Sequence, residues 1–161
     1  STITFEATGG NTGGYGKIDN TAGQWGVLVS GDPTPISLTS LGLTAGQTYD
    51  FKFDMIDLGA GAFGPSSGIG GLKLESWGGA GLLDATGDNP QNATTSWATY
   101  TESYTIAAGA TGLKFVPVVG GANASHIGFD NVGVITAVPE PSSIALLGLA
   151  ASGLLARRRR S

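Results

Sequence analysis

The sequence has 161 residues, 28 of them glycine, and no cysteine. The lack of cysteine excludes a disulfide framework and thiolate chemistry, and the glycine content is far above the ~7% of ordinary proteins. Residues 1–137 carry four lysines and eleven carboxylates, a net charge of −7, which argues against a nucleic-acid-binding protein. Such an acidic chain is compatible with calcium or neutral sugars, and its length suits one domain.

The first half of the chain alternates apolar and polar residues in short runs. This alternation predicts strands over residues 2–6, 15–19 and 24–30, and a strand or a loop over 36–42. In the clearest run, Tyr49, Phe51, Phe53 and Met55 alternate with Asp50, Lys52 and Asp54. We expect the first four side chains in the core and the other three on a solvated or concave sheet face.

The second half continues the pattern with longer glycine-rich connections, at residues 58–71 and 78–95. Strands are predicted from Leu72 to Trp77, from Trp97 onward, over 113–119 and over 127–134. Pro117 suggests a sheet edge or bulge, and a change of parity predicts a bulge near Asp130. Eight to ten short strands predict an all-β fold, a jelly-roll β-sandwich of two antiparallel sheets, in preference to an immunoglobulin-type sandwich.

Four stretches together resemble carbohydrate-binding modules built on the galactose-binding-like jelly roll: Ile3–Glu6, Gly13–Ile18, Leu43–Phe53 and Ile127–Val132. The resemblance implies that Glu6 in the first strand and Asp130 in the last are ligands of a structural calcium ion. Calcium takes six to eight oxygen ligands, which two carboxylates and loop carbonyls can supply. The alternative is that both are ordinary residues of a polar sheet face.

Sugar binding requires aromatic platforms, because a pyranose ring presents an apolar face of C–H bonds. The candidates are Tyr15, Trp25, Trp77 and Trp97. Trp25 shares its parity with Val27 and Val29, which favours a core position for it over a platform. Trp77 and Trp97 flank Gly- and Asn-rich loops, where we expect them to be exposed.

Catalysis has little support, and we expect a protein that is not an enzyme. His126 is the only histidine, no nucleophile motif accompanies it, and we expect it at a strand edge. A pair of carboxylates such as Asp54 and Asp57 could in principle serve a glycosidase, but a small sandwich offers no evident deep cleft.

The C-terminal segment, residues 138–161, has three parts. Pro139, Glu140 and Pro141 form a stiff boundary, residues 142–156 are uncharged and mostly apolar, and four arginines follow: Arg157, Arg158, Arg159 and Arg160. A 15-residue helix rises ~22 Å against ~30 Å of hydrocarbon, but arginine side chains can snorkel and extend the span. The positive-inside rule places the preceding residues outside the membrane. The alternative is a C-terminal core helix with a solvated basic end.

This segment resembles the PEP-CTERM sorting signal of Gram-negative bacteria. The resemblance implies an exported protein held transiently in the inner membrane by its helix until an exosortase acts, then placed at the cell surface or in the extracellular matrix. Because the sequence starts at Ser1 without an apolar leader, we expect a secretion signal to have been removed. The predicted function is non-catalytic binding or organisation of extracellular polysaccharide; the alternative is a structural surface protein that self-associates without a sugar site.

Overall fold

The computed structural model describes residues 2–22, 25–27, 34–61, 64–120 and 124–137. The predicted apolar helix and the sorting residues of the C-terminal segment lie outside these ranges. Within them, no helix is long and apolar enough to cross a membrane.

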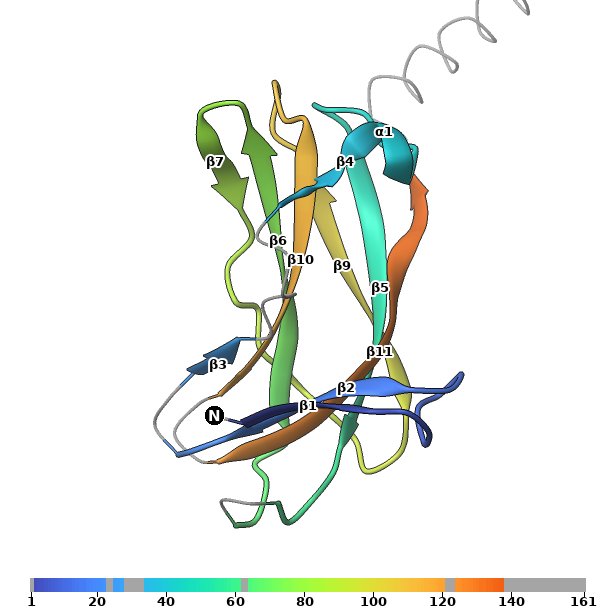
Figure 1. Cartoon of the computed structure of the whole chain (residues 1–161), viewed down its shortest axis with the longest axis vertical. Helices are drawn as coiled ribbons and strands as arrows, with labels where there is room; N and C mark the ends of the chain where they lie inside the picture. Colours follow the sequence, from blue (N-terminus) through green and yellow to red (C-terminus); the bar gives the residue numbers. More distant parts are fainter. Residues whose placement is uncertain (1, 23–24, 28–33, 62–63, 121–123, 138–161) are drawn as a thin grey trace, which may run out of the picture.

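The described residues form two antiparallel sheets packed face to face (Figure 1). The first sheet has five strands, in the order β1 (Thr2–Glu6), β2 (Tyr15–Asn20), β11 (Ser125–Ala137), β5 (Thr48–Asp57) and β9 (Ala98–Thr105). The second runs β3 (Trp25–Val27), β10 (Gly112–Gly120), β6 (Ile69–Gly78) and β7 (Gly81–Ala85); β4 (Ile36–Ser37) also pairs with β10, and β8 (Gln91–Asn92) with β6. The all-β prediction with two antiparallel sheets is confirmed.

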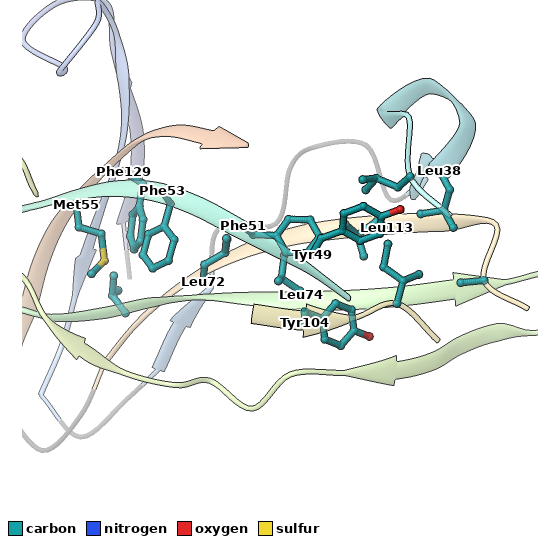
Figure 2. Close-up of a cluster of buried hydrophobic side chains, with 14 of the residues drawn as sticks. Leu38, Tyr49, Phe51, Phe53, Met55, Leu72, Leu74, Tyr104, Leu113 and Phe129 are labelled. Atoms are coloured by element: carbon teal, nitrogen blue, oxygen red, sulfur yellow. The ribbon is translucent and has the colours of Figure 1, made fainter. Parts of the chain in front are cut away.

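The core lies between the sheets and is built by the alternation read from the sequence. Tyr49, Phe51, Phe53 and Met55 point inward from β5 toward Leu72 and Leu74 of β6 (Figure 2). Each large apolar side chain withdrawn from water contributes about 1.5–3 kcal/mol before entropy is counted. The prediction that the aromatic residues of β5 are core residues is confirmed.

Three local features differ from the expectation. Residues 36–42 form a two-residue strand followed by one helical turn, α1 (Leu38–Leu41), which buries Leu38. Strand β6 already starts at Ile69, inside the predicted loop, and its first residues pair with β8. Gly71 allows a close approach there, since a Cβ would lie 2.8 Å from the carbonyl oxygen of Asp88. Strands β7 and β8 occupy the connection predicted to be turn-rich.

Two predicted irregularities can be compared with the strand register. The register between β11 and β5 shifts between Asp130 and Gly133, so the bulge is confirmed. Pro117 pairs with Leu72 in the interior strand β10, so the edge prediction is wrong as stated. On the other side of β10, however, the described strands pair only at residues 112–113 and 118–120, and Pro117 lies between these two stretches, where it interrupts no ladder.

Candidate functional site

The outer face of the five-stranded sheet carries a polar network centred on Asp54. Asp54 lies opposite Asp130 of β11 on one side and Thr99 of β9 on the other. The connection between β1 and β2, residues 7–14, folds over this point, since the Asn11 amide donates to Asp54 Oδ2 at 2.7 Å. The network therefore joins three strands and a loop that are far apart in the sequence.

Asp54 is 3% exposed and accepts three hydrogen bonds from neutral side chains. Besides Asn11, the Asn131 amide donates to Oδ2 at 2.7 Å and the Thr99 hydroxyl to Oδ1 at 2.6 Å. Burial alone would raise the pKa of Asp54, but these three hydrogen bonds and the charge of Lys52 together lower it below its ordinary value. Asp54 is thus a buried carboxylate at neutral pH, and the prediction of a solvated row is wrong for this residue.

The Asp130 carboxylate holds the same loop by accepting hydrogen bonds from backbone amides. Its Oδ2 accepts from the Thr12 amide at 3.1 Å and its Oδ1 from the Asn131 amide at 2.8 Å. The Thr12 hydroxyl donates to Asn131 Oδ1 at 2.6 Å. Asn131 has a φ of +50°, a left-handed conformation that asparagine tolerates better than most residues, and this turns its amide toward Asp54.

Beside this network, Tyr15 and Trp97 form an aromatic pair. Their ring centroids are 5.4 Å apart at an interplanar angle of 79°, and Trp97 Nε1 donates to the Gly9 carbonyl at 3.1 Å. The Tyr15 ring lies against the backbone of β11, because a Cβ on Gly128 would be 2.9 Å from its Cδ2 atom. Both side chains are half-buried, so the pair is fixed in place and still offers ring surface to a ligand.

The predicted calcium ligands lie on separate strands. Glu6 pairs with Tyr15, so β2 lies between β1 and β11 and the two carboxylate-bearing strands are ~10 Å apart. Near Asp130 the loop packs tightly, since a Cβ on Gly10 would lie within 2.8–2.9 Å of Asp130 Oδ2 and of the carbonyls of Gly13 and Gly14. In the described part of the chain, no three His, Cys, Asp or Glu side chains are grouped to hold a metal. Glu6 and Asp130 are thus separated by β2.

The four predicted platform residues do not form one site. Tyr15 and Trp97 are together on the five-stranded sheet, whereas Trp77 belongs to β6 of the second sheet. Trp25 lies in β3 of that second sheet, and its side chain is outside the description.

The residues considered for catalysis are placed differently from the expectation. His126 is wholly buried instead of lying at an edge, with Nδ1 2.9 Å from Asp19 Oδ1, and Lys17 Nζ lies 3.3 Å from the other oxygen of Asp19. Asp54 and Asp57 have opposite parity on β5 and thus face opposite sides of the sheet. Asp57 accepts a hydrogen bond from the Gly59 amide at 3.0 Å. They do not form a catalytic pair.

Comparison with solved structures identifies the fold class as that of the carbohydrate-binding-module jelly roll. The CBM22-1 xylan-binding domain of Paenibacillus barcinonensis Xyn10C has a TM-score of 0.53 at 12% identity, covering 86% of this chain and 82% of that one. A family 11 carbohydrate-binding module from Clostridium thermocellum, solved with a β-1,3-1,4-mixed-linked tetrasaccharide, has a TM-score of 0.53 at 13% identity, covering 86% and 85%. The enzymatically active domain of bacteriophage CBA120 tailspike protein 4 also scores 0.53 at 12% identity, but only 18% of that chain is covered, against 83% of this one. At these identities the likeness concerns the fold alone.

The sequence comparison identifies the C-terminal segment. Residues 137–160 match the PEP-CTERM protein-sorting motif, which indicates export and sorting by an exosortase. The match begins at the last residue of β11. No curated protein matches the chain.

Sequence reasoning missed most of the polar network. Asn11, Thr12, Thr99 and Asn131 carried no signal as individual residues, and Asp54 was expected in a row on a solvated or concave sheet face. The one usable signal was the parity change at Asp130 and Asn131, which marks the bulge that turns Asn131 toward Asp54.

Proposed function

We propose that this protein is exported to the cell surface or extracellular matrix and there binds or organises polysaccharide without catalysis. The observation that carries the proposal is the Tyr15–Trp97 pair beside the Asp54 network, on the outer face of a jelly-roll sheet. We call the surface made by Tyr15, Trp97 and residues 9–12 the loop-side surface.

The chemistry of the loop-side surface suits a neutral sugar polymer. Aromatic rings receive the C–H face of a pyranose, and neighbouring hydroxyl and amide groups pair with its hydroxyls. Both rings are held by contacts within the protein, so little conformational entropy is lost when a ligand binds. A buried carboxylate nearby disfavours anionic sugars, which points to neutral chains such as xylan or mixed-linkage glucan.

The sorting motif supports the location. In this proposal the apolar residues 142–156 hold the protein in the inner membrane of a Gram-negative bacterium, and an exosortase then acts at Pro139, Glu140 and Pro141. The arginines at 157–160 remain on the cytoplasmic side. Intact mass of the protein recovered from the cell surface tests this step, and a mass that includes residues 142–161 counts against processing.

A structural calcium ion at the base of the loop is part of the same proposal. Asp130 of β11 and Glu6 of β1 are the carboxylates proposed to hold the ion, with β2 between their strands. Calcium should then raise the melting temperature relative to chelator, and Asp130→Ala should abolish the difference. An unchanged melting temperature in chelator would contradict the calcium site without affecting the sugar proposal.

The test of polysaccharide binding compares two tryptophans. Trp97→Ala should weaken binding to mixed-linkage β-glucan about tenfold or more, the size expected for a central aromatic contact. Trp77→Ala, the same substitution on the opposite sheet, is the matched control and should leave this binding unchanged. Absence of glucan and xylan binding by the unaltered chain, or equal losses in both variants, would overturn the role of the loop-side surface.

A specific observation also favours the alternative, a structural protein that self-associates. Strand β1 is at the edge of its sheet, and its Ile3 and Phe5 side chains are 46% and 76% exposed. Unpaired edge strands with exposed apolar residues tend to pair with other chains. Sedimentation of the unaltered protein and of Phe5→Lys distinguishes polysaccharide binding from self-association. If the unaltered protein binds no glycan and forms a polymer that Phe5→Lys does not form, the structural role is favoured.

A further inference from the structure

The outer face of the second sheet carries an ordered row of side chains that the proposed function does not use. On β6, Leu72, Leu74 and Ser76 point into the core, so the alternate residues Lys73, Glu75 and Trp77 point outward. Lys114 of β10 lies directly opposite Glu75 in the register.

The Trp77 ring is fixed by two contacts. Its Nε1 donates to Glu75 Oε2 at 3.1 Å, and Lys114 Nζ lies 4.2 Å from the ring centroid, a cation–π distance. Glu75 is itself held, because Lys73 Nζ lies 3.3 Å from its Oε1. The half-buried indole is therefore a preorganised platform on the solvent face of a rigid strand.

Apolar side chains extend this platform on both sides. On β7, Leu82 pairs with Trp77 and is 51% exposed. On β10 the residue opposite Trp77 is Gly112, and a Cβ there would lie 2.7 Å from Cβ of Pro35, so a proline occupies that position. A strip of apolar side chains thus continues from Pro35 across Trp77 of β6 to Leu82 of β7.

The charges distinguish this strip from the loop-side surface. In the described part of the chain, the Lys114 ammonium has no carboxylate partner; its recorded contact is the Trp77 ring. The ammonium lies over part of the Trp77 ring and keeps N–H donors for an anion. A uronic acid would pair its carboxylate with Lys114 and set its C–H face against Leu82 and the uncovered part of the Trp77 ring.

We propose that Trp77, Lys114 and Leu82 form a second carbohydrate-binding surface, which takes uronate-containing polysaccharide. Figure 1 places β6, β7 and β10 in the layer opposite β5, β9 and β11, so the two surfaces face away from each other and can be occupied together. One protein molecule then connects a neutral chain to an acidic one. The inference extends the proposed function, and the second surface does not require the first.

The test uses the full chain in mild detergent with polygalacturonate and mixed-linkage β-glucan as separate probes. Trp77→Ala and Lys114→Gln should each weaken polygalacturonate binding, by about tenfold and about threefold or more respectively, and leave glucan binding unchanged. Trp97→Ala should do the reverse. Polygalacturonate binding should also weaken in high salt, because the ammonium–carboxylate attraction is screened.

Mixing both polymers with the unaltered protein should raise turbidity through cross-linking, and either tryptophan variant should abolish this. If polygalacturonate does not bind, or binds equally well to Trp77→Ala and Lys114→Gln, the second surface is overturned. A change in sedimentation of Trp77→Ala with unchanged polygalacturonate affinity would instead assign the strip to a contact between copies of the chain. Failure of glucan binding alone would overturn the first surface and leave the second.

Discussion

The two outer faces of the sandwich are stabilised in opposite ways. On the five-stranded sheet, a loop covers Asp54, and neutral donors satisfy the buried carboxylate. On the second sheet, the partly exposed side chains of Lys73, Glu75, Trp77 and Lys114 interact with one another on the outer face. The first network should therefore matter for stability as well as binding, whereas the second should matter for binding alone.

The largest effect is expected from a substitution of the buried carboxylate, Asp54. Asp54→Ala removes the common acceptor of the Asn11 amide, the Thr99 hydroxyl and the Asn131 amide, which should cost about 3 kcal/mol of unfolding free energy. Urea denaturation measures the change. The control is Asp50→Ala on the same strand face, where the Ser103 hydroxyl donates to the carboxylate, and it should cost about 1 kcal/mol or less. Equal losses would show that the network contributes nothing beyond a surface hydrogen bond.

The same carboxylate predicts a pH dependence. The pKa of Asp54 is lower in the folded protein than its ordinary value of 3.8, so its contribution to stability is present above pH 3.8. It is lost as the pH falls through the lower pKa of the folded state. Melting temperatures of the unaltered protein and of Asp54→Asn should therefore differ by a constant amount at neutral pH and converge in strong acid. If the difference in melting temperature already shrinks between pH 7 and pH 5, this would contradict a lowered pKa of Asp54 in the folded protein.

A smaller effect is expected where the loop meets the sheet. Asn11→Ala removes one of the three donors while Thr99 and Asn131 still pair with Asp54, and it should cost about 1 kcal/mol. The same loop accepts a hydrogen bond from Trp97 at the Gly9 carbonyl, so the affinity for glucan should fall as well. Thermal denaturation and glucan titration of the same preparation check both effects; Thr8→Ala, an exposed residue of the loop, is the matched control.

The smallest effect on stability is expected on the outer face of the second sheet. Lys114→Gln removes an exposed cation–π contact and should change the free energy of unfolding by about 0.5 kcal/mol. A loss above 2 kcal/mol in urea denaturation would mean that the second face is a structural network like the first.

Sequence periodicity predicted the features that depend only on residues within one strand. The inward row of β5 and the bulge after Asp130 were found in this way. Contacts between distant segments were not, because Asn11 meets Asp54 only when β2 and β5 both pair with β11. Leu82 and Leu83 are adjacent and both exposed, so β7 has no alternation to detect.

The position of Trp77 illustrates the same limit. Its residue type and flanking loops suggested an exposed platform; its ring is on the outer face but half-buried. Only the strand order separates it from Trp97, by assigning the two tryptophans to different sheets. Patterns within one segment cannot supply that assignment, because it depends on which strands pair.

Strand β11 has a mechanical consequence. It lies between β2 and β5, and the sorting motif begins at its last residue, Ala137. β11 pairs with β5 over residues 127–137 and with β2 over residues 125–129. A pull on its C-terminal end therefore loads the β5 ladder lengthwise first and the β2 ladder behind it. The strand that connects the sandwich to its tether is thus one of those best placed to resist being dragged out while the protein is held at a membrane.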